Sequence, residues 1–364
     1  MEWTGEQRAA LDKVGRWLKA GEPQIFRLFG YAGVGKTTLA RHAAESGKAD
    51  PAYAAFTGKA ALVMRSKGCA GATTIHSLIY RTIEGEDGAG PSFTLNHDGP
   101  ASKAGLIVID ECSMVDAELG RDLMSFGKPI LVLGDPAQLP PVKGGGFFTD
   151  AEPDVMLTEI HRQAKDDPII RLSTQVRVGG RLAYGDFGTA SIIRRADLAS
   201  EAVLAADQVL VGLNRTRRLY NQRIRELKKI DGAAPSVGDK LVCLRNDRAK
   251  GLINGGLWRV EAIRPPRNEF LRLTLKAEDE IGRAGVKVSV LKQFFDGGEE
   301  SLTPAQRRDS DQFDFGYALT VHKAQGSQWD EVMLFDEAYA FGENRNRWLY
   351  TGLTRAAKRL TVVR

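Results

Sequence analysis

Short runs of apolar residues recur along the first part of the chain, and each run ends in a glycine or an acidic turn. Four of these runs have the length of a buried strand, at positions 25–29, 52–56, 106–109 and 130–133. Segments with a helical spacing of apolar residues separate them, for example at 38–45 and 117–124. Buried strands that alternate with helices are typical of a parallel sheet covered on both faces. The pattern therefore predicts an α/β domain.

The same alternation begins again in the second half of the chain. Apolar runs predict a second set of buried strands at 208–213, 316–321, 332–335 and 360–363. A chain of 364 residues is long enough for two domains of about 150 residues, each with a core of its own. We therefore expect an α/β fold with two tandem domains built on parallel sheets.

Residues 84–104 interrupt the first domain. They are rich in glycine, proline and serine, and Phe93 and Leu95 stand between polar neighbours. This composition predicts a short hairpin-like insert, with an irregular surface loop as an equal alternative. The first domain then consists of residues 1–83 and 105–158.

Residues 235–312 interrupt the second domain with an all-β pattern. Strand-like segments lie at 240–244, 257–263, 271–275 and 286–290. Asn254-Gly255, between the first two of them, is a strong signal for a hairpin turn. We predict a small β barrel or sheet, inserted into a second domain that consists of residues 159–234 and 313–364.

Composition and charge are those of a globular protein with a mildly basic surface. Lys and Arg number 51 against 46 Asp and Glu, a net charge of +5, which fits a nucleic-acid partner but also a mixed solvated surface. No apolar stretch approaches the roughly 18 residues of a membrane span, and the start at Met1 shows no basic and apolar leader. Cys69, Cys112 and Cys243 are far apart, so we expect small core residues in a reducing cytoplasm rather than a zinc site or disulfides.

The first predicted strand leads into a glycine-rich segment, Gly30-Tyr-Ala-Gly33-Val-Gly35-Lys36-Thr37, which fits the pattern G-x-x-x-x-G-K-[ST]. Between a strand and a helix, such glycines let backbone N–H groups surround phosphate oxygens. Lys36 is expected to reach the β- and γ-phosphates of a nucleotide, and Thr37 to bind Mg²⁺. The predicted nucleotide contacts in this segment are Gly33, Val34, Gly35, Lys36, Thr37 and Thr38.

A pair of carboxylates follows the strand predicted at 106–109. Asp110, at the end of that strand, is in the position of a Mg²⁺ ligand, and Glu111 in that of a general base for the attacking water. An isolated Asp-Glu pair is usually a solvated turn. Its position after an apolar strand and downstream of a phosphate-binding loop favours the catalytic interpretation.

The strand predicted at 130–133 leads into Gly134-Asp135-Pro136-Ala137-Gln138-Leu139-Pro140-Pro141. Because it ends at the same edge of the sheet, Asp135 and Gln138 should lie near the nucleotide. The amide of Gln138 can both donate to and accept from a γ-phosphate or its water, while the structural alternative is a turn-capping amide.

Together these segments resemble superfamily 1 DNA helicases, in the form of the RecD and Dda branch rather than the UvrD and Rep branch. The resemblance also rests on Thr57-Gly58-Lys59-Ala60-Ala61, Glu159-Ile160-His161-Arg162-Gln163, the segment 319–328 and Tyr350-Thr351-Gly352-Leu353-Thr354-Arg355-Ala356. It implies two RecA-like domains with ATP and Mg²⁺ as cofactors. It also implies ATP-driven movement along single-stranded DNA in the 5′-to-3′ direction, coupled to duplex unwinding.

The resemblance further implies roles for individual residues. Gln7 matches the glutamine that reads adenine, and Arg162 and Arg355 match two arginines that reach the γ-phosphate from the second domain. The expected catalytic set is therefore Lys36, Asp110, Glu111, Gln138, Arg162 and Arg355. The expected contacts to the DNA strand are Thr57, Lys59, Thr74, His76, Thr320 and His322.

The two inserts and the partners also have counterparts in the family. The early insert would carry a strand-separating pin, and the late insert would be an SH3-like module. The implied partners are single-stranded DNA and junctions with duplex, bound by a monomer in the cytoplasm of a bacterial or phage-infected cell, with replication or repair proteins as candidate further partners. Since no large extension precedes the first motif, we expect a compact helicase without fused relaxase or oligomerisation domains.

Two other functions are compatible with the nucleotide-binding motifs. The motor motifs would be identical in a DNA-stimulated ATPase that strips proteins from DNA without unwinding it. A nucleotide switch, such as a clamp-loader subunit, is a second alternative.

The basic run at 215–229 has an apolar face formed by Leu219, Ile224 and Leu227, and we interpret it as a solvated basic helix.

Overall fold

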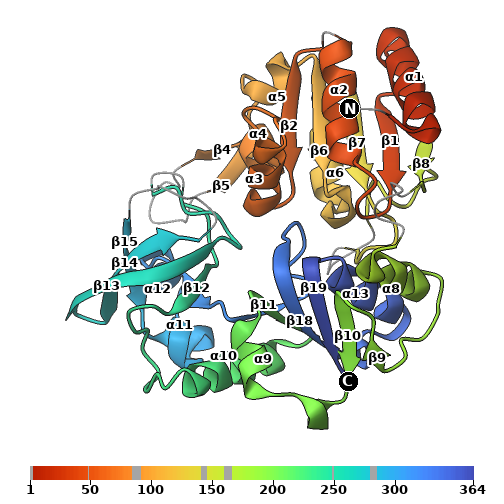
Figure 1. Ribbon diagram of the computed structural model, residues 1–364. Helices are drawn as coiled ribbons and strands as arrows, with labels where there is room; N and C mark the ends of the chain where they lie inside the picture. The colour runs from red at the N-terminus through yellow and green to blue at the C-terminus, as the bar shows by residue number, and fades with distance from the viewer. Residues whose placement is uncertain are drawn as a thin grey trace. The chain divides into compact units, whose positions relative to one another are not determined.

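The computed structural model describes residues 3–47, 49–83, 92–140, 146–159, 166–247, 250–278 and 285–364. The chain forms two compact units (Figure 1). Unit 1 comprises residues 1–181 and 343–354, and unit 2 comprises residues 182–342 and 355–364. Among the described residues, no helix has the length and apolar character needed to cross a membrane.

Unit 1 is built on a parallel sheet with the strand order β3-β2-β6-β7-β1-β8. Its strands are β1 (Ile25–Gly30), β2 (Pro51–Ala55), β3 (Thr73–Thr74), β6 (Leu106–Asp110), β7 (Ile130–Gly134) and β8 (Val155–Leu157). The four strands predicted for this domain are confirmed. The short strands β3 and β8 were not predicted, because two or three residues are too few to show an alternation of apolar and polar positions.

Helices cover both faces of this sheet, as Figure 1 shows. One face packs against α1 (Gly5–Ala20), α2 (Lys36–Ser46) and α3 (Gly58–Ser66), and the other against α4 (Ile75–Ile79), α5 (Pro100–Lys103) and α6 (Ala117–Met124). Successive residues of β6 alternate between the two cores: Leu106 and Val108 face the first, Ile107 and Ile109 the second. This explains the continuous apolar runs, because strands buried on both faces have no polar side.

An antiparallel pair of strands, β4 (Tyr80–Ile83) and β5 (Ser92–Leu95), stands apart from this sheet. Residues 84–91, which form part of the predicted insert, lie outside the described residues. Phe93 on β5 is 66% exposed, although large apolar side chains usually lose most of their exposure on folding. Two further helices of unit 1, α8 (Pro168–Arg177) and α13 (Arg345–Leu353), pack against each other.

Unit 2 contains a second, mostly parallel sheet with the order β17-β11-β18-β19-β10-β9, in which only β9 runs antiparallel to its neighbour among the described strands. Its strands are β9 (Gly185–Asp186), β10 (Ala190–Ile193), β11 (Gln208–Val211), β17 (Ala318–Thr320), β18 (Trp329–Phe335) and β19 (Ala356–Val363). Helices α9 (Ser200–Ala205) and α10 (Asn214–Leu227) contribute Val203 and Ile224 to its core. The predicted second α/β sheet is thus confirmed, while the predicted domain bounds stay a prediction.

The β segment of unit 2 forms an antiparallel sheet with the order β15-β14-β13-β12-β16. Its elements are β12 (Lys240–Cys243), β13 (Leu257–Arg267), β14 (Phe270–Ala277), β15 (Val286–Leu291) and β16 (Phe313–Phe315), with the short helices α11 (Gln293–Asp296) and α12 (Pro304–Asp309). Because β16 pairs with β12, the sheet continues past residue 312. Gly255 turns the chain at φ +83° just before β13, so the Asn254-Gly255 turn ends a longer connection between β12 and β13.

The interpretation of the basic run at 215–229 as a solvated helix is wrong for two of its arginines. Arg217 and Arg225 on α10 are buried. Arg217 forms an ion pair with Asp314 (2.5 Å) and Arg225 one with Asp239 (3.2 Å). The predicted apolar face is also wrong in part, because Ile224 is buried whereas Leu219 and Leu227 are exposed. Helical periodicity could not show that two guanidinium groups would turn inward and meet the carboxylates of Asp314 and Asp239.

The Arg225–Asp239 pair lies at the centre of a buried network. Arg225 also donates to the backbone carbonyls of Gly232 and Ala234 (2.5 and 2.8 Å). Asp239, which has no exposed surface, accepts a hydrogen bond from the Tyr317 hydroxyl (2.9 Å).

The three cysteines are buried as predicted. Burial raises the pKa of Cys69 to about 11 and that of Cys243 to about 12, so both stay protonated thiols at neutral pH.

We expect Asp239→Asn to destabilise unit 2 by about 3–5 kcal/mol, because it leaves the Arg225 charge buried without its counter-ion. Glu226→Gln is the matched control. Glu226 pairs with Arg223 on the exposed side of the same helix, where such a pair contributes about 0–1 kcal/mol. Urea unfolding of both variants measures the difference, and equal unfolding free energies would show that the buried pair does not hold α10 to the β segment.

Candidate functional site

The glycine-rich segment of unit 1 forms a loop between β1 and α2. Gly33 and Gly35 adopt φ values of +83° and +82°, which residues with a Cβ atom rarely adopt. Gly35 precedes the first residue of α2, so the loop leads directly into the positive end of that helix. Backbone N–H groups that point into such a loop form an anion-binding concavity. The local geometry is that of a phosphate site.

The side chain of Lys36 folds over this loop. Its ammonium group donates to the carbonyls of Gly30 (2.7 Å) and Tyr31 (3.0 Å). Gln7, which is buried in α1, donates its side-chain amide to the carbonyl of Val34 (3.1 Å) and accepts the backbone N–H of Thr4 (3.0 Å). Lys36 and Gln7, two of the residues predicted to contact a nucleotide, therefore both lie at the loop.

Thr37 and Asp110 lie together at the carboxyl edge of the sheet. The Thr37 hydroxyl on α2 donates to Oδ2 of Asp110 at the end of β6 (2.8 Å), and Oδ1 of Asp110 accepts the backbone N–H of Glu111 (2.8 Å). A hydroxyl and a carboxylate side by side are ligands of the kind that Mg²⁺ prefers. Among the described residues, no group of three or more His, Cys, Asp or Glu side chains could hold a metal by itself.

Glu111, the predicted general base, has a left-handed backbone at φ 54° and ψ 45°. A non-glycine residue in this region costs roughly 1–3 kcal/mol and often marks a functional site. The conformation reverses the chain immediately after β6, because the next residues, Cys112–Met114, form a 3₁₀ turn. The role of Glu111 as general base stays a prediction.

The segment after β7 brings two more polar side chains to the same edge. Asp135 is buried, and its Oδ1 accepts the backbone N–H of Ala137 (3.0 Å). Gln138 is 5% exposed, and its side-chain oxygen has no hydrogen-bond partner within the described part of the chain. Leaving a buried acceptor unpaired costs about 1–3 kcal/mol. This oxygen is therefore suited to accept a hydrogen bond from a bound group.

Two aromatic contacts at this edge were not predicted. The Tyr350 hydroxyl on α13 accepts the backbone N–H of Ala32 (3.2 Å) and donates to Oδ2 of Asp135 (2.5 Å). The guanidinium of Arg177 on α8 lies 3.3 Å from the centroid of the Tyr31 ring. Tyr350 was part of a recognised motif, and a buried tyrosine needs a hydroxyl partner. The identity of that partner could not be obtained from sequence.

The predicted strand-binding threonines have local structural roles as well. The hydroxyl of Thr57 accepts the N–H of Ala60 at the start of α3, and that of Thr74 accepts the N–H of Ser77 at the start of α4 (both 3.1 Å). Thr320 accepts the N–H of Lys323 (3.3 Å). Such hydroxyl contacts are typical of helix and turn caps.

The predicted histidines pack against aromatic rings, and Lys59 is buried in α3. His76 contacts Phe56 and Tyr80, with ring centroids 6.4 and 5.6 Å away, and His322 contacts Phe341 at 5.5 Å. Burial lowers the pKa of both histidines, which favours the neutral form at pH 7. As neutral rings they can stack or donate one hydrogen bond, but they add little charge to a phosphate site.

Of the two arginines predicted to reach the γ-phosphate, the structure describes one. Arg162 lies outside the described residues. Arg355 belongs to unit 2, where it is buried and donates to the carbonyl of Ser327 (3.1 Å). Ser327 is the last residue but one of the predicted motif at 319–328, so Arg355 contacts that motif directly.

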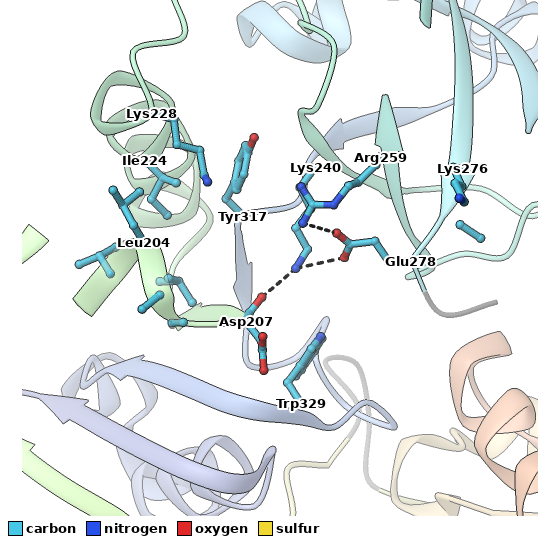
Figure 2. A pocket seen from close by; sticks show the side chains of 15 residues that line it. Leu204, Asp207, Ile224, Lys228, Lys240, Arg259, Lys276, Glu278, Tyr317 and Trp329 are labelled. Carbon is cyan, nitrogen blue, oxygen red and sulfur yellow. Dashed lines mark hydrogen bonds and ion pairs between the residues drawn. The ribbon is translucent and has the colours of Figure 1, made fainter. Parts of the chain in front are cut away.

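Unit 2 also contains a cavity of about 660 Å³ between its mostly parallel sheet and its antiparallel sheet (Figure 2). Figure 2 shows Lys240 and Arg259 converging on Glu278, at 3.3 and 2.8 Å, while Lys240 also donates to the carbonyl of Asp207 (2.8 Å). None of the predicted site residues that the structure describes lines this cavity. Glu278 thus pairs with two of the four basic side chains that line the cavity, Lys228, Lys240, Arg259 and Lys276.

Family models match two parts of the chain. An AAA domain model matches residues 3–197, and a UvrD-like helicase C-terminal domain model matches residues 315–363. The first match alone covers more than half of the sequence. The two matches include every motif on which the resemblance to superfamily 1 was based.

Curated relatives agree with these matches. The chain is 30% identical over 385 aligned positions to the ATP-dependent RecD2 DNA helicase of Deinococcus radiodurans, covering 97% of this chain and 48% of that protein. It is 26% identical to the probable conjugal transfer protein TraA of Sinorhizobium fredii, covering 90% of this chain and 30% of TraA. The chain thus spans about half or less of the length of these relatives.

Solved structures share the fold. A crystal structure of Bacteroides Pif1 bound to single-stranded DNA matches with a TM-score of 0.61 at 20% identity, covering 100% of this chain and 92% of that one. Pif1 helicase from Candida albicans matches with a TM-score of 0.59 at 20% identity, covering 100% of this chain and 94% of that one. At this identity the likeness establishes the fold.

We expect ATP with Mg²⁺ to stabilise the protein against heat and Lys36→Ala to abolish this effect, because the ammonium is the positive side chain of the loop that a phosphate would contact. The unliganded melting temperature should change little, since the ammonium contacts only carbonyls of its own loop in the described structure. Lys19→Ala, an exposed lysine at the end of α1, is the control. A normal ATP-dependent shift in Lys36→Ala would contradict the nucleotide site.

Proposed function

We propose that this chain, which belongs to the AAA domain family and is a RecD-like member of superfamily 1, is an ATP-dependent DNA helicase. It would hydrolyse ATP, move along single-stranded DNA in the 5′-to-3′ direction and unwind duplex DNA. The observation that supports this most strongly is the convergence of the phosphate loop, the Thr37–Asp110 pair and Gln138 at one edge of the sheet in unit 1.

We propose the following roles in hydrolysis. The loop from Gly33 to Thr38 and the ammonium of Lys36 would bind the phosphates, and Gln7 would contact the adenine. Thr37 and Asp110 would hold Mg²⁺, which would supply positive charge against the charge that develops on the phosphates. Their oxygen atoms fit such an ion, since they already lie 2.8 Å apart.

Glu111 would orient the attacking water and accept its proton. Its carboxylate follows Asp110 directly, so the base and the metal ligand are held by one turn. Gln138 would hydrogen-bond the γ-phosphate or that water through its unpaired oxygen or its amino group. Arg162 and Arg355 would stabilise charge on the transferred phosphoryl group, an effect of roughly 10³–10⁵ in rate where such arginines are known.

The DNA strand would contact Thr57, Lys59, Thr74 and His76 in the first RecA-like domain, and Thr320 and His322 in the second. Thr57 stands at the start of α3, where backbone N–H groups and the helix dipole favour a phosphate. Contacts of this kind position the strand without reading its sequence. Binding should therefore show little sequence preference.

The domain division of the proposed helicase follows the sequence pattern. Residues 1–83 with 105–158, and 159–234 with 313–364, would form the two RecA-like domains. Residues 84–104 would carry the pin and 235–312 the SH3-like module. The partners would be single-stranded DNA and its junctions with duplex, bound by a monomer, with replication or repair proteins as further candidates. The three buried cysteines support a reducing cytoplasmic setting.

A DNA-stimulated translocase that does not unwind is the second candidate. The exposed ring of Phe93 favours unwinding over this alternative. It stands on a β hairpin outside the central sheet, and apolar side chains of this kind can separate stacked base pairs.

Strand displacement tests the proposed function directly. We expect ATP-dependent displacement from a duplex with a 5′ single-stranded tail and little displacement from one with a 3′ tail. ATP hydrolysis measured in the same reactions should be stimulated by single-stranded DNA. Stimulated hydrolysis without displacement would support the translocase instead, displacement from 3′ tails would contradict the proposed direction, and hydrolysis unaffected by DNA would contradict both motor functions.

We expect Phe93→Ala to reduce the unwinding rate by about tenfold and to leave DNA-stimulated ATP hydrolysis within about twofold of normal, because unstacking a base pair costs a few kcal/mol and the wedge supplies part of it. Tyr339→Ala is the control, since Tyr339 is a similarly exposed aromatic residue in unit 2. Normal unwinding by Phe93→Ala would show that the strands are separated elsewhere.

A further inference from the structure

Tyr350 connects the phosphate loop to the segment after β7 through a single hydroxyl group. Its side chain is 2% exposed. The backbone N–H of Ala32 donates to the hydroxyl (3.2 Å), so the hydroxyl proton is directed to Asp135 (2.5 Å). Burial, followed by the Asp135 carboxylate, raises the pKa of the phenol, which therefore keeps this proton.

Neighbouring contacts also connect α8 and α13 to the phosphate loop and to the segment after β7. Thr351, next to Tyr350 on α13, accepts the backbone N–H of Leu139 (3.0 Å). Arg177 stacks on the Tyr31 ring, next to Ala32 in the loop. Helices α8 and α13, which pack together, thus contact both the phosphate loop and the 134–140 segment. The sequence from α13 continues after one residue to Arg355.

The groups that would face a triphosphate are bound to the protein itself in this structure. The Ala32 N–H is bound to Tyr350, and the Lys36 ammonium to the carbonyls of Gly30 and Tyr31. Phosphate oxygens are stronger acceptors than a neutral phenol, because hydrogen bonds to charged groups are about twice as strong. A bound triphosphate that reaches the Ala32 N–H would release one of the two bonds of Tyr350 and leave the bond to Asp135.

We propose that Tyr350 is a positioning residue that transmits occupancy of the phosphate loop to α13 and to Arg355, which follows α13 in the same motif. This inference rests on the proposed function and deepens it. When a nucleotide binds, the Ala32 N–H donates to a phosphate oxygen instead of to the Tyr350 hydroxyl. Helix α13 then contacts the loop differently, although Thr351 still bonds Leu139. Such differential contacts are what a coupling between two binding sites requires.

The experiment measures coupling rather than activity alone. The affinity of the full chain for an oligothymidylate is determined with and without a non-hydrolysable ATP analogue and Mg²⁺, at fixed salt. The ratio of the two dissociation constants is the coupling factor. We expect Tyr350→Phe to reduce this factor by about tenfold, equivalent to about 1.4 kcal/mol, and to leave analogue affinity in the absence of DNA unchanged or tighter, since the competitor for the Ala32 N–H is gone.

Tyr53→Phe is the matched control, because Tyr53 is a buried tyrosine on β2 of the same unit, away from the loop contacts of Tyr350. Asp135→Asn serves as a second variant that keeps the side-chain shape. If the hydroxyl acts through Asp135, the double variant Tyr350→Phe with Asp135→Asn should lose less coupling than the sum of the single variants.

The outcomes separate the two levels of inference. A wild-type coupling factor retained within twofold in Tyr350→Phe would overturn the role of Tyr350 while leaving the helicase intact. Weaker binding of the analogue without loss of coupling would assign the hydroxyl to structure alone and overturn it as well, as would failure of both Tyr350→Phe and Asp135→Asn to fold. A wild-type chain with no DNA-stimulated ATP hydrolysis would instead contradict the proposed function.

Discussion

The parallel pairing of β6, β7 and β1 is the constraint on which the site in unit 1 depends. Residues pair in the registers Val108↔Leu131 and Leu28↔Leu133, and the strands run in one direction. Their carboxyl ends therefore bring Gly30, Asp110 and Gly134 to a single edge. Because both faces of these strands are buried in separate cores, a shift of one residue would exchange the two sets of side chains between cores of different shape.

Polar groups are placed just beyond these strand ends, and burial makes their partners specific. Asp110 binds Thr37, and Asp135 binds Tyr350, in each case through a hydroxyl from a different element. A carboxylate removed from water is strongly destabilised unless such donors surround it. The same rule operates in unit 2, where Asp239 and Asp314 accept from the two buried arginines of α10. Elements far apart in the chain are thereby held in one arrangement.

Two of the threonines proposed to contact the DNA strand have a local structural role. Thr57 and Thr74 each cap a helix through the side-chain oxygen, and the same cap fixes the direction of the adjacent backbone N–H groups. A hydroxyl that forms a cap still has lone-pair and donor capacity for a second partner; the Thr74 hydroxyl, for example, donates to Ser77 (2.8 Å). Capping and strand binding are therefore compatible in one residue, and the residue type alone does not separate them.

The sequence by itself determined the two α/β sheets, the phosphate loop and the carboxylates after β6, because continuous apolar runs and glycine spacing are local signals that neighbouring residues carry. It did not determine the short strands β3, β8 and β9, whose pairing depends on longer neighbours. It also did not reveal the partners of Arg217, Arg225 and Tyr350. Each of these contacts joins residues far apart in the chain, and only the tertiary structure decides which buried charge or hydroxyl meets which acceptor.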